Sequence, residues 1–329
     1  TTTTQISTLS LHDALPISQS PDVLRVYFLI YCFHPNPYQA ADISAKVGQY
    51  VLTLLQVNHT HHEFSVVSDS QLLDYLIHPF EFRHLVDIAR REDCISLDAM
   101  RKVTSKNLGF TALEACPGEH PPMPSASDIY YVFPYALNLD NLNRLCNTLR
   151  TQAQPCLLSI AMRPYCITEQ DEKNFESRIF RCEKYSQLSF KNAGDNVDLL
   201  EPFLIKQAEM LYENCTKDLA YLQDAAFLQK VQIASSLPIA QALVTITGST
   251  LTEHAGHPKL VFSKEWRNRL TGGYDWYAPE NEVQFRKAAD NLNWLQFDPL
   301  LPTCAPQGKE HWRYLFGVSQ AVAAFRLPI

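Results

Sequence analysis

Glycine is scarce in this chain, and none of the glycines lies in a recognisable phosphate-binding loop. Ten glycines occur among 329 residues. A Walker A loop needs G-x-x-x-x-G-K-[ST] and a dinucleotide-binding turn needs G-x-G-x-x-G, because backbone N–H groups must come close to the phosphates. Gly248 and Gly256 fit neither spacing, and no Lys-Ser or Lys-Thr pair follows Gly256. We therefore expect no catalytic and no cofactor-binding residues for nucleotide chemistry in this chain.

Long apolar runs, an excess of positive charge and C-x-x-C pairs are also missing. No run reaches the roughly 18 apolar residues of a membrane span. The net charge of −7 argues against a protein that binds nucleic acid over its whole surface. The nine cysteines are odd in number, so we expect reduced thiols in a cytoplasmic protein and neither a disulfide framework nor a zinc ribbon. With 46% hydrophobic and 19% charged residues, the composition is typical of a folded globular protein.

The first twenty residues differ in character from the rest. They lack the basic start and the long apolar core of a signal peptide. Residues 9–18, LSLHDALPIS, resemble a peptide produced when sequencing-adapter DNA is translated. We expect residues 1–20 to be a non-native leader, and we leave them out of the prediction of the fold.

Residues 21–98 predict a first β-α-β module. The module starts with an almost continuously apolar stretch that suits a buried strand. Asn36 can cap the helix that follows, and Pro37 suits its first position. The elements expected here are a strand over 23–33, a helix from 37 to about 57, a strand over 63–67, a short helix capped by Asp69 and a helix over 80–91. Residues 99–128 are irregular and rich in proline, which predicts a linker.

Residues 129–256 predict a second module, β-α-β-α, with a long helix. The elements expected here are strands over 129–133, 154–162 and 228–234, and helices over 140–149, 168–190, 200–222 and 238–247. Residues 257–329 are loop-rich, with a last helix over 280–295, a strand over 312–316 and a short helix over 319–325. Alternation of strands and helices indicates an α/β or α+β fold, with two loosely similar halves and long amphipathic helices packed on mixed sheets.

Two sets of residues are candidates for an interface. Leu204, Leu211 and Leu219 belong to a stripe of about three heptads, which favours a helix packed on a sheet and leaves a seam between subunits as the alternative. Arg83, together with Arg90 and Arg91, lies in a run of mixed charge. That run favours a solvated helix face, and its alternative is a docking surface for a partner protein.

Histidines and cysteines give no sharp catalytic or metal signature. His59, His61 and His62 precede Glu63, but histidines at the end of a helix are common and no H-E-x-x-H or Cys/His spacing supports zinc. His254 and His257 form a weaker pair of the same kind. We expect no metal site, and we interpret the free cysteines as small buried hydrophobes.

One region combines basic and aromatic side chains, a combination that can pair with phosphates and stack on the bases of single-stranded nucleic acid. Its members are Arg267, Arg269, Arg286 and Lys287, with Trp266, Tyr274, Trp276 and Tyr277. Acidic neighbours such as Glu265 and Asp275 dilute the positive charge. Contact with nucleic acid is therefore a weaker alternative than contact with protein.

The C-terminal residues carry a family resemblance. Residues 313–328 read RYLFGVSQAVAAFRLP. This run is similar to the segment that joins the N-terminal region of HerA/VirB4-like P-loop ATPases to their motor domain. Weaker similarity is found at residues 158–164, 227–235 and 291–299, so the resemblance covers roughly residues 129–329.

The resemblance implies a non-catalytic N-terminal scaffold or assembly region of an ATP-driven translocase that moves DNA or protein. Phe325, Arg326, Leu327 and Pro328 would couple this region to the motor. ATP and Mg²⁺ would belong to the motor domain, which would also provide self-association, and an accessory protein is the other partner implied. Because Walker A, Walker B and an arginine finger are missing, we expect the chain to be truncated before its P-loop. The alternatives are a stand-alone protein-interaction module and a small-molecule enzyme with an unrecognised site.

Overall fold

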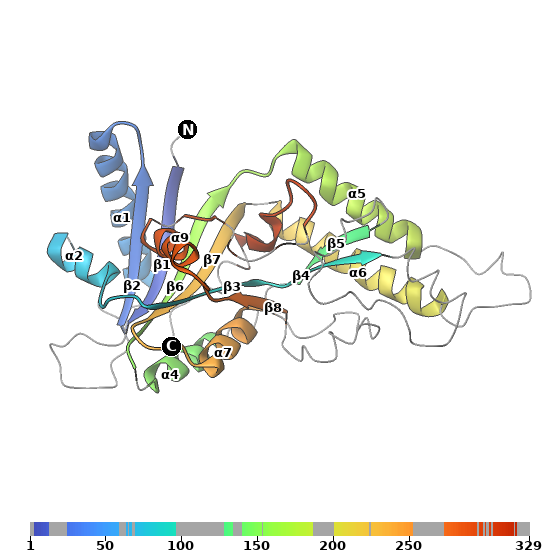
Figure 1. Ribbon diagram of the computed structural model, residues 1–329. Helices are drawn as coiled ribbons and strands as arrows, with labels where there is room; N and C mark the ends of the chain where they lie inside the picture. Colours follow the sequence, from blue (N-terminus) through green and yellow to red (C-terminus); the bar gives the residue numbers. More distant parts are fainter. Residues whose placement is uncertain are drawn as a thin grey trace, which may run out of the picture.

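The computed structural model contains a large antiparallel sheet with helices on both of its faces (Figure 1). The residues that the structure describes are 3–12, 25–58, 64, 66–67, 70–96, 128–133, 140–152, 154–186, 201–223, 225–252, 273–294, 296–298, 300, 303, 305–318 and 320.

Strands and helices are interspersed along the described chain, singly or in short runs of one kind. The strands are β1 (Thr3–His12), β2 (Arg25–Phe33), β3 (His84–Arg90), β4 (Glu92–Ser96), β5 (Asp128–Val132), β6 (Cys156–Tyr165), β7 (Ala226–Ser235), β8 (Tyr274–Tyr277) and β9 (Leu315–Gly317). The helices are α1 (Pro37–Asn58), α2 (Ser70–Ile77), α4 (Asp140–Arg150), α5 (Glu169–Ser186), α6 (Glu201–Leu222), α7 (Gln241–Leu251) and α9 (Glu282–Asn293), with a 3-10 turn, η2, at Trp312–Tyr314.

Seven strands form the main sheet. Six lie in the order β2-β1-β6-β7-β3-β8, and β9 pairs with β7, while β4 and β5 form a separate two-stranded sheet. The predicted mixture of helices and sheet is confirmed, and its α+β form applies because all the ladders of the described strands are antiparallel. The mixed pairing expected from β-α-β units is not found in these ladders. The physical reason for antiparallel pairing can be followed at β6 and β7. Two helices, α5 and α6, join these strands, so the chain runs out along one helix, returns along the other and enters β7 at the end of the sheet where β6 finished.

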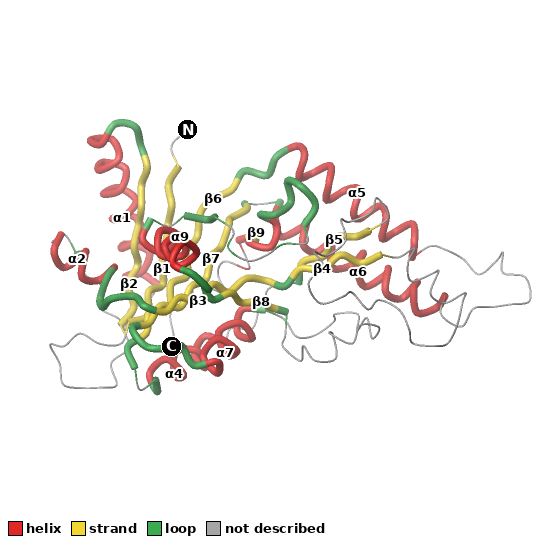
Figure 2. The backbone as a smooth tube through the Cα atoms, in the orientation of Figure 1, coloured by secondary structure: helices red, strands yellow, loops and turns green. Residues whose placement is uncertain are grey.

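Each face of the sheet is covered by a different set of helices (Figure 2). Val86 and Leu158 pack in a cluster with residues of α4 and α7. Their sequence neighbours Leu85 and Leu157 pack in a second cluster with residues of α9. Neighbouring residues of a strand point to opposite faces, so β3 and β6 are buried on both sides. The helices α5 and α6 form a hairpin that extends away from the sheet beside β4 and β5 (Figure 1).

Two predicted elements are wrong. The helix expected over 80–91 is strand β3, which pairs with β7 on one edge and with β8 on the other. Burial on both faces removes the polar-apolar alternation that would have indicated a strand, and the apolar residues left behind fit a helical stripe. The strand expected over 63–67 is also not formed, since the described residues 64, 66 and 67 have no regular structure.

The remaining elements are confirmed to within a few residues where the structure describes them, except that the strand expected over 312–316 begins only at Leu315, since Trp312–Tyr314 form the turn η2. Asn36 Oδ1 accepts from the backbone N–H of Tyr38 (2.9 Å) and caps α1 as expected. The leader expected over 1–20 contains β1, which lies between β2 and β6; whether it is native stays a prediction. The linker expected over 99–128 falls almost wholly outside the described residues. The strands β3, β7 and β8 come from three different predicted segments, yet they lie in one sheet.

The close approach of β9 to α6 gives a testable prediction. A Cβ added at Gly317 would overlap the carbonyl oxygen of Tyr221, and backbone cannot move aside as a side chain can. We expect Gly317→Ala to lower the free energy of unfolding by about 1–3 kcal/mol, measured by urea titration. The matched control is Gly48→Ala in α1, where nothing lies within 4 Å of the new Cβ, and it should raise stability by about 0.5–1 kcal/mol. A Gly317→Ala variant as stable as the wild type would contradict this packing.

Candidate functional site

Buried polar contacts gather where residues 311–317, which we call the C-terminal segment, meet the sheet. Arg90, at the end of β3, is buried and donates to the carbonyls of Trp312 (2.7 Å), Arg313 (3.1 Å) and Leu315 (2.5 Å). It also donates to the carbonyl of Phe133 (3.3 Å), next to β5. One cation thereby joins β3, the end of β5 and the C-terminal segment, a task that suits the several fixed donors of a guanidinium.

Arg313 makes the reciprocal contact. Its Nη2 donates to the carbonyl oxygen of Arg90 (3.0 Å) and its side chain is only 1% exposed. Glu92 lies 3.5 Å from its Nη1, and Asp275 lies 3.4 Å from its Nη2 and 3.2 Å from Nε of Arg91. Burial alone would lower the pKa of Arg313, but the neighbouring acidic groups, chiefly Glu92, raise it above the usual value. The network therefore keeps Arg313 charged inside the protein.

Asp171, in the first turn of α5, anchors the other side of the C-terminal segment. Its Oδ1 accepts from Nε1 of Trp312 (2.9 Å) and lies 3.1 Å from Nε2 of His311. Its Oδ2 accepts from the hydroxyls of Thr168 (2.7 Å) and Tyr165 (2.9 Å). Burial alone would raise the pKa of Asp171, but these hydrogen bonds outweigh it and hold the pKa below the usual value.

The start of α5 explains how Asp171 is placed. The backbone N–H of Thr168 donates to Asp171 Oδ2 (3.2 Å), and the N–H of Asp171 donates to Thr168 Oγ1 (3.1 Å). This reciprocal pair is the capping box predicted at 168–171. One turn further on, Phe175 stacks on the ring of Trp312 at a centroid distance of 4.1 Å. A local sequence signal thus positions the carboxylate, while the packing of Trp312 brings the distant segment to it.

The lowered pKa of Asp171 predicts a loss of stability in acid. A group whose pKa is lower in the folded state contributes stability above its unfolded pKa and loses it as the pH falls through the folded pKa. We expect Asp171→Asn to lower the free energy of unfolding at about pH 7. The difference in this free energy between variant and wild type should shrink by about pH 3, as measured by urea titrations at both pH values. Asp42→Asn, which removes an exposed ion pair with Lys46, is the control and should show a small gap throughout. A gap for Asp171→Asn that does not change with pH would contradict the assignment.

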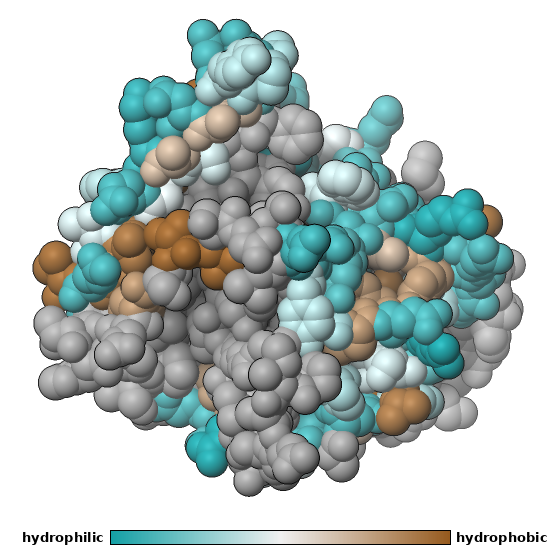
Figure 3. All heavy atoms as spheres, turned by 90° about the vertical axis from the view of Figure 1, so that its left-hand side faces the viewer, coloured by the Kyte–Doolittle hydropathy of each residue, from teal (hydrophilic) through white to brown (hydrophobic). Residues whose placement is uncertain are grey.

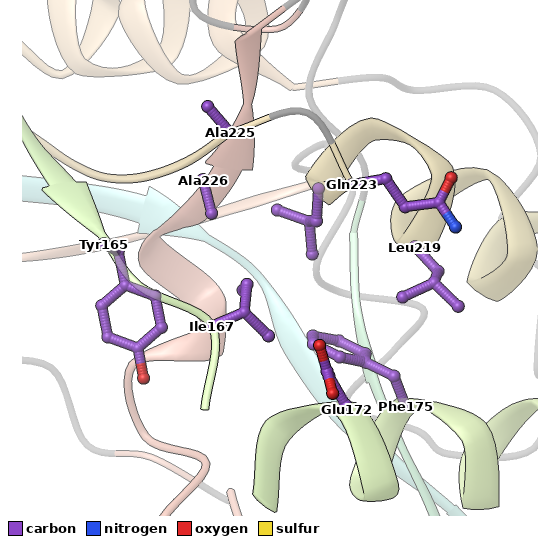
Figure 4. Close-up of a pocket in the computed structure, with 9 residues that line it drawn as sticks. Tyr165, Ile167, Glu172, Phe175, Leu219, Gln223, Ala225 and Ala226 are labelled. Atoms are coloured by element: carbon purple, nitrogen blue, oxygen red, sulfur yellow. The ribbon is translucent and has the colours of Figure 1, made fainter. Parts of the chain in front are cut away.

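A cavity of about 320 Å³ is lined by Tyr165, whose hydroxyl donates to Asp171 (Figure 4 shows the cavity). Tyr165 and Ile167 approach it from the end of β6, Phe175 and Glu172 from α5, and Leu219 from α6. The remaining lining residues are Leu222, Gln223, Ala225 and Ala226. Polar atoms of Tyr165, Glu172 and Gln223 share the lining with apolar side chains, so the cavity offers both hydrogen-bonding groups and apolar surface.

A second buried charge pair lies within the sheet. Lys230 of β7 and Asp87 of β3 are 3.3 Å apart, and both side chains are 3% exposed. Burial raises the pKa of Asp87 and lowers that of Lys230, and the attraction between the two opposes both shifts. Lys230 also donates to the carbonyl of Asp298 (2.9 Å), so the pair connects two strands to the segment after α9.

Comparison with known proteins adds no assignment to this geometry. No protein-family model, curated protein or solved structure matches the chain. The interpretation of the site therefore depends on its own contacts.

The arginines proposed for an interface occupy different environments. Arg83 is exposed and pairs with Glu81 at 2.7 Å, as a solvated face would. Arg90 and Arg91 are buried, so the solvated or docking face expected from them is wrong. The physical reason is that their charges are neutralised by distant partners, such as Asp275 for Arg91, which a local charge run does not reveal.

The described part of the leucine stripe packs within the chain. Leu211 is fully buried among residues of α5 and β5, which agrees with packing within the chain. Leu219 lines the cavity, and the side chain of Leu204 lies outside the described residues. The motor-linker candidates, Phe325, Arg326, Leu327 and Pro328, lie outside them too.

The ligand candidates from the sequence are only partly described. His59, His61, His62, Glu63, His254, His257, Trp266, Arg267 and Arg269 lie outside the described residues. Tyr274 is buried against Gly248, so it is not free to stack on a base, while Arg286 pairs with Glu282 on the surface of α9. In the described ranges no group of three potential ligands is placed to hold a metal ion. None of the helices described there is long and apolar enough to cross a lipid bilayer.

Proposed function

We propose that this chain is a non-catalytic scaffold or assembly region of a cytoplasmic, HerA/VirB4-like ATP-driven translocase of DNA or protein. The observation that carries the proposal is the set of hydrogen bonds from Arg90 to Trp312, Arg313 and Leu315. The run that resembles the family's motor linker, residues 313–328, starts inside this bonded segment. The residues that would lead to a motor are thus bound to the sheet at their start.

The buried network gives that connection stiffness. Removing charges from water is unfavourable unless they are paired, so the pairing of Arg313 with Glu92 and Asp275 favours one arrangement of the C-terminal segment. β9 adds backbone pairing with β7 at Leu228 and Leu315. A force applied beyond residue 317 would therefore be transmitted to the sheet as a unit, which is what a coupling region requires.

The sharpest test is to read the coding DNA beyond codon 329. The proposal expects G-x-x-x-x-G-K-[ST] soon after Ile329, on a strand-loop-helix pattern. A native stop codon at that position contradicts it. A second readout is ATP hydrolysis by the purified chain, for which we expect no turnover above that of a mock preparation; turnover that survives removal of contaminants would contradict the non-catalytic role.

One observation favours the alternative, a stand-alone protein-interaction module. Helix α1 has 22 residues, and none of its side chains is buried. Tyr38, Tyr50 and Val57 are each more than 60% exposed. Figure 3 views the molecule from the side that carries α1 and α2 and shows apolar residues between hydrophilic ones on this surface. Under this alternative a native stop codon follows Ile329, and the protein is stable and monodisperse without a motor chain.

A further inference from the structure

Two buried thiols lie in one cluster between α5 and α6. Cys182 of α5 and Cys215 of α6 are both fully buried and unbridged. They pack in one cluster with Leu211 and with Tyr131 and Phe133 at β5. The two cysteines thus share one buried cluster between packed helices, and a disulfide of about 2.05 Å between them would join α5 to α6.

A buried cation with uncommitted donors lies next to this pair. Arg178, one turn before Cys182 on α5, acts electrostatically on both thiols. Its Nε and Nη2 have no hydrogen-bond partner in the structure, although Nη2 lies 3.8 Å from a carboxylate oxygen of Asp218. A buried guanidinium with unused donors is suited to a neighbouring anion, and a thiolate is the anion that this site can generate.

The two thiols are not equivalent. Interaction with the Cys182 thiol, with a further contribution from Arg178, lowers the pKa of Cys215 although burial opposes it. The pKa of Cys182 is raised, chiefly by the same interaction and by burial. Asp218 opposes ionisation of Cys215, and its own pKa is raised by burial. Cys215 is therefore the sulfur that ionises first and attacks first.

We propose that Cys182 and Cys215 form a reversible redox site that a peroxide converts into a disulfide joining α5 to α6. The Cys215 thiolate attacks one oxygen of hydrogen peroxide; the O–O bond breaks, the sulfur becomes a sulfenic acid and the first water leaves. The Cys182 sulfur then attacks that sulfur, the S–S bond forms and the second water leaves. Two thiols lose two electrons and two protons, and one peroxide is reduced to two waters.

The disulfide would act on the same hairpin that holds the C-terminal segment. The Arg178 guanidinium lies 5.2 Å from the ring of Trp312 and 5.3 Å from that of Phe175, so the redox site and the Asp171 cluster share this side chain. A crosslink between α5 and α6 removes conformations of the unfolded chain and stabilises the hairpin. The inference goes beyond the scaffold role and holds whether or not a motor domain follows.

Tryptic mapping tests the site on the wild-type protein, with no variant required. The folded chain is treated with hydrogen peroxide, free thiols are alkylated and the protein is digested without reductant. We expect peptide 182–184 linked to peptide 207–217, and its loss after reduction with dithiothreitol. Absence of this linked peptide, with both thiols alkylated or with Cys215 oxidised to sulfinic acid, overturns the proposal.

Variants separate this crosslink from nonspecific oxidation. Cys182→Ala should abolish the linked peptide and leave Cys215 as a sulfenic acid that a dimedone-type reagent traps. The matched control, Cys166→Ala, removes an exposed cysteine and should keep the crosslink. Peroxide should raise the thermal midpoint of the wild type and of the control but not that of Cys182→Ala. An equal rise in all three proteins would overturn the proposal.

Discussion

Replacement of Arg90 by methionine is expected to lower the free energy of unfolding by about 3–5 kcal/mol, as measured by urea titration at about pH 7. Methionine fills much of the same volume but cannot donate. The carbonyls of Trp312, Arg313, Leu315 and Phe133 each lose a buried hydrogen bond from a charged donor. The C-terminal segment should also become accessible to proteases, because its bond to β3 is gone.

Arg83→Met is the matched control for this prediction. Arg83 lies just before β3, is exposed and pairs with a carboxylate two residues away, Glu81. Its replacement should change stability by no more than about 0.5 kcal/mol. If Arg83→Met and Arg90→Met had equal and small effects, the Arg90 contacts would contribute nothing to holding the C-terminal segment.

Replacement of Lys230 by methionine should have an effect of similar size, about 3–5 kcal/mol at about pH 7, because the carboxylate of Asp87 then lies buried without its cation. The effect should depend on pH. Burial raises the pKa of Asp87 in the folded state, so its contribution to stability is present below its unfolded pKa and is lost as the pH rises through the folded value. Without Lys230 the pKa of Asp87 in the folded state is raised further, because the attraction to the lysine that lowers it is lost. The Lys230→Met variant should therefore recover stability as the pH is lowered towards about pH 4.

A double variant isolates the electrostatic part of that loss. Asp87→Asn with Lys230→Met removes both charges, so it should be more stable at about pH 7 than Lys230→Met alone. Lys173→Met is the control, since Lys173 forms an exposed pair with Glu169 at 3.8 Å. A loss below about 1 kcal/mol for Lys230→Met, or no recovery in the double variant, would mean that the pair is not coupled as the structure indicates.

The sequence predicts an element well where a single buried face or a local capping signal is enough to define it. The stripe that contains Leu211 predicts α6, and in its described part the buried side chains of Leu211, Cys215 and Leu222 follow the expected helical spacing. The capping box at Thr168 and Asp171 is local, so its spacing alone predicts the start of α5. β3 was missed because Leu85 and Val86 are both buried, on opposite faces, and no polar residues mark a solvent side.

The candidate site could not be predicted in the same way, because its partners are distant in the sequence. Arg90 and Trp312 are 222 positions apart, and Asp171 and Trp312 are 141 apart. A run of charges gives no indication of which members are neutralised by distant acidic groups. The sequence pattern around Trp312 indicated a strand and a family resemblance, but not that its indole N–H meets a carboxylate of α5. Likewise, nothing in the spacing of Cys182 and Cys215 predicts that they share one buried cluster.

Hydrogen exchange of the wild-type protein tests the central claim most directly, namely that the C-terminal segment is part of the core of the scaffold. The measurement compares the amides of residues 315–317 with those of β6 and β7 and with those of α1, which has no buried side chain. We predict that 315–317 exchange as slowly as the central strands, because β9 and the Arg90 contacts open only when the sheet opens. Fast exchange of 315–317 while β6 and β7 stay protected would show a loosely attached segment, and would contradict both the structural account and the coupling role proposed from it.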